Sequence, residues 1–392
     1  MHPQPSNATR RRRRSSRVLA GTVAVGISVA VAACGSSSSS SSAGSSPVSS
    51  AASGNTSSAA AGAVSALSQY MSAPTKINIT TPLKSTPPAG KTVVVLGTPL
   101  PQNVEVQQTV SQLAKMVHWN YSMVSYDPAN PATFSSAVDT ALAKHADYLV
   151  EAGLPLTPSI LQKVKAAGAK FALASVYPAT VQPPVIAVSD SYAQDAAMGK
   201  IVAKYFVADS GGKGKALLEH VPAYPILGGF TDAFSAEVKA TCPGCSVKLV
   251  NVTIPQLAAG QLVSTVVSAL RQNPTSNYLV FDDGPFATGI TSALNAAGLS
   301  KVKVIGEAGD ATNLAALRSG TQAAWTGYSA AYETYQDMDA MLRDAEGMTI
   351  PVDQEGVQPT QLLTKSNVGS TTDWNYPTDA LDQFKALWKV SG

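Results

Sequence analysis

The chemistry-bearing residues of this chain are acids, amides and tyrosines placed where short β-strands are expected to end. They are Gln102, Asn103, Glu151, Tyr177, Asp190, Tyr224, Asp283, Glu307, Asp310 and Tyr328. In an open parallel sheet, a ligand lies beyond the carboxyl ends of the strands. Carboxylates accept hydrogen bonds and aromatic rings cover apolar faces, so this set predicts a pocket for a small polar ligand. For any single acid the alternative is a helix N-cap or a solvated loop residue, and Asp190 is the one that best fits a cap or hinge role.

The sequence offers no catalytic or metal-binding pattern. It contains no G-x-S-x-G, H-E-x-x-H or P-loop motif. His118, His145 and His220 fall on separate predicted elements, without the spacing of a triad or a metal site. The glycine- and lysine-rich run at 211–215 lies between a helix and a strand, which is the wrong order for binding phosphate. We therefore expect neither an enzyme nor a cofactor or metal site.

The elements that must position these residues alternate between strand and helix from Lys91 onward. The β-branched run 92–97 shows no polar alternation, which is typical of a strand that is covered on both faces. Further strands are predicted at 121–126, 147–151, 170–176, 185–188, 215–221, 246–252, 278–282, 302–306 and 323–326. Helices are predicted from Asn103 and at 132–144, 158–167, 192–208, 228–240, 258–271, 286–297, 314–317, 331–345 and 379–388. This alternation and strand count indicate an α/β fold with two doubly wound parallel sheets.

The N-terminus has the three parts of a secretory signal. A cationic segment, Arg10 to Arg17, is followed by an uncharged apolar run that ends in Val-Ala-Ala-Cys at Cys34. The apolar run has at most 16 residues, fewer than the roughly 20 that a membrane-spanning helix needs. The ending resembles a bacterial lipobox, so residues 1–33 are predicted to be a lipoprotein signal peptide and Cys34 the lipid-bearing residue. A chance Cys after an ordinary signal is the alternative, and the choice between Sec and twin-arginine export stays open.

Removal of residues 1–33 changes the charge of the chain. They hold six Arg and no Lys, Asp or Glu, so the mature chain has 22 basic and 25 acidic residues and a net charge of −3 rather than +3. This balance gives no support for nucleic-acid binding. Residues 34–90 are rich in Ser and Ala and are predicted to be a tether, with a possible short helix at 59–70.

Cys242 and Cys245 form a C-x-x-C pair around Pro-Gly. Redox motifs of this kind follow a strand and begin a helix, whereas this pair follows a predicted helix and precedes a strand. No second Cys pair offers metal ligands. Pro-Gly suits a tight turn and the exterior is oxidising, so a local structural disulfide is favoured over free thiols.

From Lys91 onward the chain resembles the type I periplasmic binding proteins of the ribose- and sugar-binding kind. The segments that carry the resemblance are Leu173-Ala-Ser-Val-Tyr177, Val188-Ser-Asp190, Gly229-Phe230, Phe281-Asp-Asp-Gly-Pro-Phe-Ala-Thr-Gly289, Ala296-Ala-Gly298, Val304-Ile-Gly306 and Thr364-Lys-Ser-Asn-Val368. The resemblance implies two lobes that close on a ligand, with crossings near Asp190, Tyr328 and Lys365. One lobe would be 91–189 with 329–364, and the other 190–328 with 365–392.

The family resemblance also implies a function and shows three departures. It implies a monomeric, lipid-anchored solute-binding protein on the outer face of the cytoplasmic membrane, which delivers a sugar, polyol or similar ligand to an ABC permease. A sensor module for a membrane receptor is the alternative. The family's sugar-binding Arg is replaced by Ile226, its pocket Asn by Asp283, and its pocket Asp by Ala308. An acceptor-rich pocket without Arg favours a donor-rich ligand, including an amine, over an anion.

Overall fold

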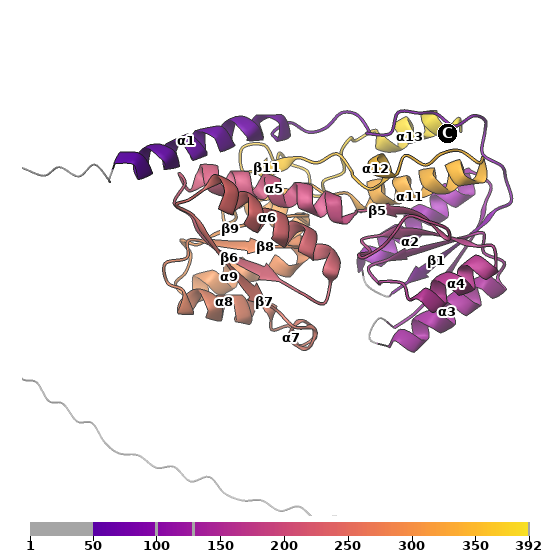
Figure 1. Cartoon of the computed structure of the whole chain (residues 1–392), viewed down its shortest axis with the longest axis horizontal. Coiled ribbons are helices and arrows are strands. Elements are labelled where there is room, and N and C mark those ends of the chain that lie inside the picture. The colour runs from indigo at the N-terminus through magenta and orange to yellow at the C-terminus, as the bar shows by residue number, and fades with distance from the viewer. Residues whose placement is uncertain (1–49, 99–100, 128–129, 391–392) are drawn as a thin grey trace, which may run out of the picture. The chain divides into compact units, whose positions relative to one another are not determined.

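The computed structural model of the chain describes residues 50–98, 101–127 and 130–390, without the side chains of 50–57, 101–103 and 131 (Figure 1). Residues 92–189 contribute the first sheet, in which five strands are all parallel in the order β2-β1-β3-β4-β5. The strands are β1 (Thr92–Gly97), β2 (Asn120–Ser125), β3 (Tyr148–Ala152), β4 (Lys170–Ala174) and β5 (Val185–Ser189). The parallel order requires a crossover between successive strands, and helices supply it.

The second sheet has six strands in the order β11-β10-β9-β8-β6-β7. They are β6 (Lys215–His220), β7 (Ser246–Asn251), β8 (Tyr278–Phe281), β9 (Lys303–Gly306), β10 (Ala324–Thr326) and β11 (Leu362–Thr364). All pairs are parallel except β10 with β11, which is antiparallel. Two mainly parallel sheets with interleaved helices confirm the predicted fold class.

Helices cover both faces of each sheet. On the first sheet, α2 and α11 lie on one face and α3 and α4 on the other, and on the second sheet α5 and α6 lie opposite α8, α9 and α10. The longer ones are α2 (Pro101–Met116), α3 (Pro131–Ala143), α4 (Pro158–Ala166), α5 (Tyr192–Asp209), α6 (Gly228–Thr241), α8 (Leu262–Gln272), α10 (Ala311–Ser319) and α11 (Ala330–Ala345). The shorter ones are α7 (Ile254–Ala258), α9 (Ile290–Ala296) and α12 (Val352–Glu355).

The predicted helix 258–271 is two helices in the structure. Thr253 caps α7, and its capping box with Gln256 begins the helix at Ile254, four residues before the predicted start. Gly260 then adopts φ +65°, which ends α7 before α8 begins. The predicted helix 286–297 likewise divides into the 3₁₀ turn η3 (Gly284–Ala287) and α9. The strand β11 and the helix α12 were not predicted.

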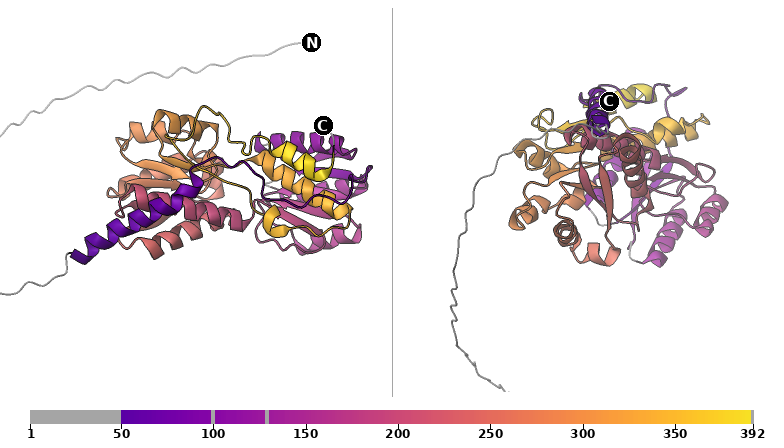
Figure 2. Two further views of the ribbon diagram at one scale, coloured as in Figure 1. Left: turned by 90° about the horizontal axis from the view of Figure 1, so that it is seen from above. Right: turned by 60° about the vertical axis from the view of Figure 1, so that its left-hand side comes forward.

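Residues 58–90, expected to be part of a tether, are packed against the folded chain. The helix α1 (Ser50–Leu67) lies along α5, with Ala63 and Leu67 buried among residues of the second sheet. After the 3₁₀ turn η1 (Ser68–Tyr70), the buried Ile77, Ile79 and Leu83 pack in the core between the first sheet, α2 and α11. We call residues 63–83 the N-terminal strap, because they join the two cores (Figures 1 and 2).

The C-terminal helix lies with the first sheet, not with the second as the expected lobe assignment had it. Phe384 and Trp388 of α13 (Ala380–Trp388) are fully buried in the same core as β1 and α11. Conversely, β11 was assigned to the first lobe, but it pairs with β10 in the second sheet. Helix periodicity defines which face of a helix is buried but does not say which core receives it.

Two predictions about the ends and the cysteines have different outcomes. The signal peptide 1–33 and Cys34 lie outside the described residues. Among residues that the structure does describe, no helix combines the length and hydropathy needed to cross a bilayer. Cys242 and Cys245 are joined in a disulfide at the turn between α6 and β7, as the sequence analysis favoured.

Candidate functional site

The carboxyl edge of the second sheet brings three titratable residues side by side. The parallel registers of β6, β8 and β9, continued by one residue or two, place His220, Asp282 and Glu307 next to one another on the face covered by α5. Asp282 is 0% exposed and Glu307 is 2% exposed. His220 Nδ1 lies 2.8 Å from Asp282 Oδ2. Asp282 Oδ1 and Glu307 Oε2 have no hydrogen-bond partner.

Helix α5, which covers this face of the sheet, adds Asp195 to the group. Helix α5 packs closely against α6 at Gly199 and Gly229, and a Cβ on Gly229 would lie 2.7 Å from the Tyr192 carbonyl oxygen and 2.9 Å from Asp195 Cβ. Asp195 is 4% exposed. Its burial, reinforced by the nearby negative charges of Asp190, Asp283, Asp282 and Glu333, raises its pKa well above the ordinary value.

Burial and mutual repulsion disfavour ionisation throughout this group. Burial raises the pKa of Asp282 and of Asp283 to about 8, with further increases from Asp283 and Glu219 respectively. It also raises the pKa of Glu307 well above the ordinary value, with Asp195 as the largest neighbouring contribution. At neutral pH these side chains therefore retain protons, and each can donate as well as accept a hydrogen bond. The sequence analysis treated them as ionised acceptors, which the burial contradicts.

The carboxyl edge of the first sheet also carries buried acids. Glu151, at the end of β3, accepts hydrogen bonds at Oε1 from Tyr126 Oη (3.3 Å) and the Leu154 amide (3.1 Å), while its Oε2 has no partner. Burial raises its pKa to about 8. Ser189 at the end of β5 donates to Asp337 Oδ1 of α11 over 2.8 Å.

Asp190 stands between the two sheets along the chain. It has φ 44°, a left-handed conformation that is uncommon for a residue with a side chain. Ser175 Oγ donates to its Oδ2 over 2.6 Å, its Oδ1 has no partner, and burial raises its pKa to about 6. Ser191, not Asp190, is the N-cap of α5, so the expected cap role falls one residue later.

The predicted tyrosines have different environments. Tyr177 follows β4 and stacks on Tyr192 with ring centroids 4.3 Å apart, and it remains 39% exposed. Tyr328 donates its hydroxyl hydrogen to Glu333, an acid buried in α11. Tyr224 is 36% exposed at the start of the 3₁₀ turn η2 (Pro225–Leu227). Tyr177 and Tyr224 are thus partly exposed to solvent, whereas Tyr328 positions an acid.

Three other predicted residues do not join the group of buried acids in the same way. Asp310 is the N-cap of α10, where its Oδ1 accepts from the Asn313 amide over 2.9 Å. It still acts electrostatically on Asp283. Gln102 and Asn103 begin α2, and their side chains lie outside the described residues.

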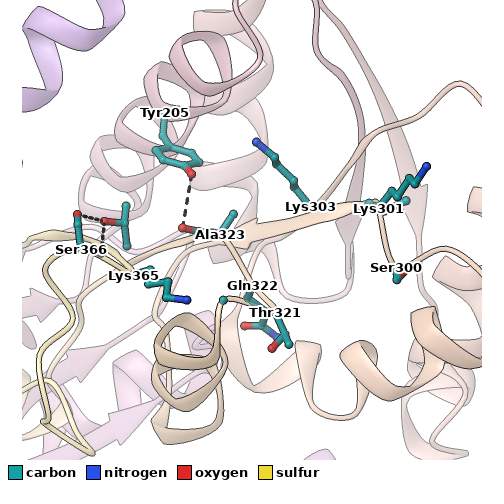
Figure 3. Close-up of a pocket in the computed structure, with 12 residues that line it drawn as sticks. Tyr205, Ser300, Lys301, Lys303, Thr321, Gln322, Ala323, Lys365 and Ser366 are labelled. Carbon is teal, nitrogen blue, oxygen red and sulfur yellow. Dashed lines mark hydrogen bonds between the residues drawn. The ribbon is translucent and has the colours of Figure 1, made fainter.

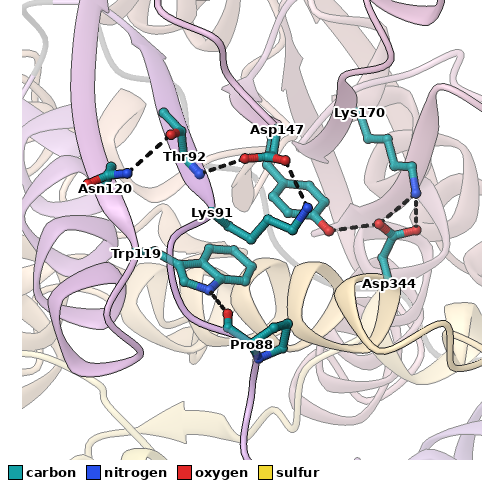
Figure 4. Close-up of polar contacts among 9 residues, drawn as sticks. Pro88, Lys91, Thr92, Trp119, Asn120, Asp147, Lys170 and Asp344 are labelled. Atoms are coloured by element: carbon teal, nitrogen blue, oxygen red, sulfur yellow. Dashed lines mark hydrogen bonds and ion pairs between the residues drawn. The ribbon is translucent and has the colours of Figure 1, made fainter.

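Cations are paired elsewhere in the described chain. At the amino ends of the first sheet, Lys91 pairs with Asp147 over 2.9 Å and Lys170 with Asp344 over 2.6 Å (Figure 4). Arg343 is buried between Asp339 and Glu355 and donates to the Thr81 carbonyl over 2.7 Å. No ion pair between described residues brings a Lys or Arg to the acids at the carboxyl ends, and no group of described side chains has metal-binding geometry.

A pocket of about 420 Å³ lies at the opposite edge of the second sheet (Figure 3). It is lined by Lys301, Lys303 and Lys365 with the hydroxyl of Tyr205 and the amide of Gln322. Lys303 begins β9 and pairs with Asp209 over 2.7 Å. Because it lies at the amino ends of the strands, this pocket is separate from the acids described above.

The sequence analysis selected Glu151, Asp190, Asp283 and Glu307 but did not select Asp195, Asp282, Glu333 and Asp337, which are buried in the structure. The rule of strand ends selects the first residue after a strand, and it passes over acids that reach the edge from a helix. Asp195 and Asp337 could have been found as charged residues on helix faces that are otherwise small or apolar. Asp282 was treated as the last residue of a strand rather than as part of the site.

Two mainly parallel sheets, each covered by helices on both faces, have the architecture of a two-lobed binding protein. Residues 93–348 match the family model described as a periplasmic binding protein domain, so the chain belongs to that family. A search of curated proteins gives no match.

Solved structures with the same fold include several binding proteins. An ABC sugar transporter subunit from Rhodobacter sphaeroides is 20% identical, with a TM-score of 0.61, covering 71% of this chain and 99% of that one. A solute-binding protein from Actinobacillus succinogenes with bound D-allose is 15% identical, with a TM-score of 0.59, covering 72% and 100%. A 5-methylthioribose-binding protein from Thermotoga lettingae is 15% identical, with a TM-score of 0.63, covering 79% and 99%. At these identities the likeness shows the fold alone.

Proposed function

We propose that this chain is an exported solute-binding protein that captures a small polar ligand at the carboxyl edges of its two sheets and delivers it to an ABC permease. The observation that supports this most directly is that Asp190, Asp282 and Glu307 each leave one buried side-chain oxygen without a hydrogen-bond partner. Buried polar atoms without partners cost about 1–3 kcal/mol each, so their retention favours a ligand that completes them. Tyr177 and Tyr224 add exposed rings that suit the apolar face of a sugar or polyol.

Several features of the chain support binding rather than catalysis. The sequence lacks nucleophile motifs, and His220, the one histidine of the acidic edge, has a pKa lowered by burial and contacts an acid rather than a hydroxyl nucleophile. Periplasmic binding proteins are not enzymes, and membership of that family favours the same conclusion here. Capture followed by release needs no bond to form or break.

Ligand capture can be tested by thermal unfolding of residues 35–392 against sugars, polyols, amines and organic acids. This length retains the N-terminal strap, which is part of the first core. A ligand at about 100 times its Kd adds roughly 2.7 kcal/mol to stability, which for a protein of this size raises Tm by several degrees. A rise in Tm with one polar solute is the expected result. A panel without any rise would contradict the proposed function.

We also infer that Cys34 carries a lipid that holds the protein at the outer face of the membrane. The Val-Ala-Ala-Cys sequence and the short apolar run support this. Acyl chains contribute about 0.8 kcal/mol per buried CH₂, and two or more chains anchor durably. In the native host, Cys34→Ser is expected to move the protein from the membrane fraction to the soluble fraction. Unchanged membrane association of the variant would refute the lipid anchor.

A further inference from the structure

The acids at the carboxyl edge of the second sheet differ from most charged side chains of this protein because no Lys or Arg of the described chain forms an ion pair with them. Asp282, Glu307 and Asp195 are at least nine-tenths buried, and the first two each leave one oxygen without a hydrogen-bond partner. Asp282 and Glu307 are register neighbours on adjacent strands. The two acids are therefore neighbours at one edge of the sheet and not scattered positions in the core.

The neighbouring groups do not supply a positive charge. His220 is in contact with Asp282, but burial lowers the pKa of His220 and so favours its neutral form. The other titratable groups that act on the three acids are all acidic. They are Glu219 from β6, Asp283 after β8, Asp190 before α5 and Glu333 from α11.

At the opposite edges of the two sheets, acidic side chains form ion pairs with lysines. Lys91 and Lys170 pair with the acids at the amino ends of the first sheet (Figure 4), and Lys303 pairs with Asp209 at the amino ends of the second. The carboxyl edge is an exception to this pairing. Among the described residues no Lys or Arg pairs with these acids, at the edge where this fold takes its ligand. This arrangement favours a ligand that brings a cation, with which the acids can pair once they release their protons.

We propose that the bound solute carries a protonated amine that is held by Asp282, Glu307 and Asp195. An ammonium group offers three hydrogen-bond donors and no acceptor, which complements unpaired carboxyl oxygens. A hydroxyl-rich remainder would suit Tyr177 and Tyr224, so an amino sugar or an amino polyol is the class that fits best. This inference rests on the proposed function and specifies its ligand.

Binding of such a ligand is coupled to proton release. Without ligand at pH 7, burial keeps the pKa of Asp282 at about 8 and its carboxyl group retains the proton. The ammonium group favours the ionised carboxylate, so the O–H bond of the acid breaks, its proton passes to solvent and the carboxylate pairs with the unchanged ammonium. Below the pKa of the acid, affinity for the amine then rises by about tenfold per pH unit for one linked proton.

The experiment compares matched solutes that differ in one group. D-Sorbitol is compared with 1-amino-1-deoxy-D-sorbitol, D-glucose with D-glucosamine, and 1,4-butanediol with putrescine, by calorimetric titration of residues 35–392. Titrations at pH 7 in phosphate and in Tris, whose ionisation enthalpies differ, give the number of protons released. The expected result is binding of an amine, release of about one proton per ligand, and affinity about tenfold weaker at pH 6 than at pH 7.

Variants test which acids hold the amine. Glu307→Gln and Asp282→Asn keep the side-chain shape but cannot ionise, and each is expected to weaken amine binding by at least about tenfold. Asp282→Asn should also reduce proton release. Asp139→Asn serves as the control, because Asp139 is an exposed acid paired with Lys163 on another part of the chain. If one variant fails to fold, the other and Asp195→Asn carry the test.

The outcomes separate this inference from the proposed function. Tight binding of a neutral sugar or polyol without proton release overturns the amine and leaves the solute-binding function intact. Absence of binding by every solute overturns both. Amine binding that Glu307→Gln, Asp282→Asn and Asp195→Asn all leave unchanged places the ligand elsewhere and overturns the assigned site.

Discussion

Glu151 is a buried acid whose hydrogen bonds allow its charge to be changed without changing its shape. Its Oε1 accepts both bonds, from Tyr126 and Leu154, and a glutamine amide oxygen could accept the same two. Its folded-state pKa of about 8 lies far above the ordinary value of 4.5. Between these two values the folded chain holds a proton that the unfolded chain has lost.

This difference predicts a pH dependence of stability. Because the pKa of Glu151 is raised on folding, its contribution to stability is lost as pH rises from about 4.5 to about 8, by up to about 1.4 kcal/mol per pH unit. Glu151→Gln is expected to make the dependence shallower and to be more stable than wild type at pH 8. Denaturant unfolding between pH 5 and pH 8 measures this effect.

The control for that measurement is Asp139→Asn, at an exposed position paired with Lys163. It should leave the pH dependence unchanged. If Glu151→Gln and wild type had parallel stability curves, Glu151 would be ionised in the folded chain and the argument from its burial would fail.

At the residue scale, the sequence identified acids near strand ends but not their protonation. The difference arises because burial depends on helices that cover the strands, such as α5 over Asp282 and Glu307. A charged residue in a sequence looks like an acceptor, and only the packing around it decides whether it retains a proton. Asp310, by contrast, was recognisable as a cap because capping depends on local sequence alone.

Among the elements, the N-terminal strap is the one that the sequence concealed most completely. Its composition, rich in Ser, Ala and Pro, is typical of a flexible linker. The structure nevertheless holds it by specific contacts. Asn78 exchanges hydrogen bonds with Tyr332, and its side-chain amide donates to the Gln354 carbonyl. The Leu83 amide donates to the Leu387 carbonyl over 2.9 Å.

The strap is therefore expected to contribute to stability. Ile79 and Leu83 are each 1% exposed, so Ile79→Ala or Leu83→Ala should reduce the free energy of unfolding by about 2–5 kcal/mol. The matched control is Val64→Ala on α1, where the side chain is 60% exposed and little change is expected. Urea unfolding of the three variants compares them directly. Wild-type stability in Ile79→Ala and Leu83→Ala would mean that the strap is not part of the core in solution.

The regular strands and helices were predictable because their patterns are local. The β-branched run of β1, the apolar run of β8 and the 3.6-residue period of α2 each indicate their own secondary structure. The three-residue strand β11 is too short for a pattern, and it forms because β10 offers an antiparallel edge. The pairing of β11 with β10 depends on the fold around β11 and not on the sequence of β11 alone.

For the whole molecule, the sequence predicted two sheets but not how often the chain passes between their cores. Among the described residues it passes five times, between Leu67 and Ile77, Ile186 and Met198, Trp325 and Tyr332, Leu342 and Leu362, and Trp374 and Ala380. The family resemblance implied three crossings. The first and the last passes involve segments outside the matched family domain at 93–348.

These passes bring distant parts of the polypeptide into one core. Ile77 and Leu83 pack with Phe384 and Trp388, so the first sheet is closed on one face by segments about 300 residues apart in the chain. A polypeptide is synthesised from its N-terminus, so residues 380–388 emerge about 300 residues after the strap with which they pack. The second sheet with α5 and α6 can assemble earlier, whereas the first sheet must wait with an apolar face open. During that interval a chaperone has a defined surface to protect, and truncation near the C-terminus would leave that surface permanently uncovered.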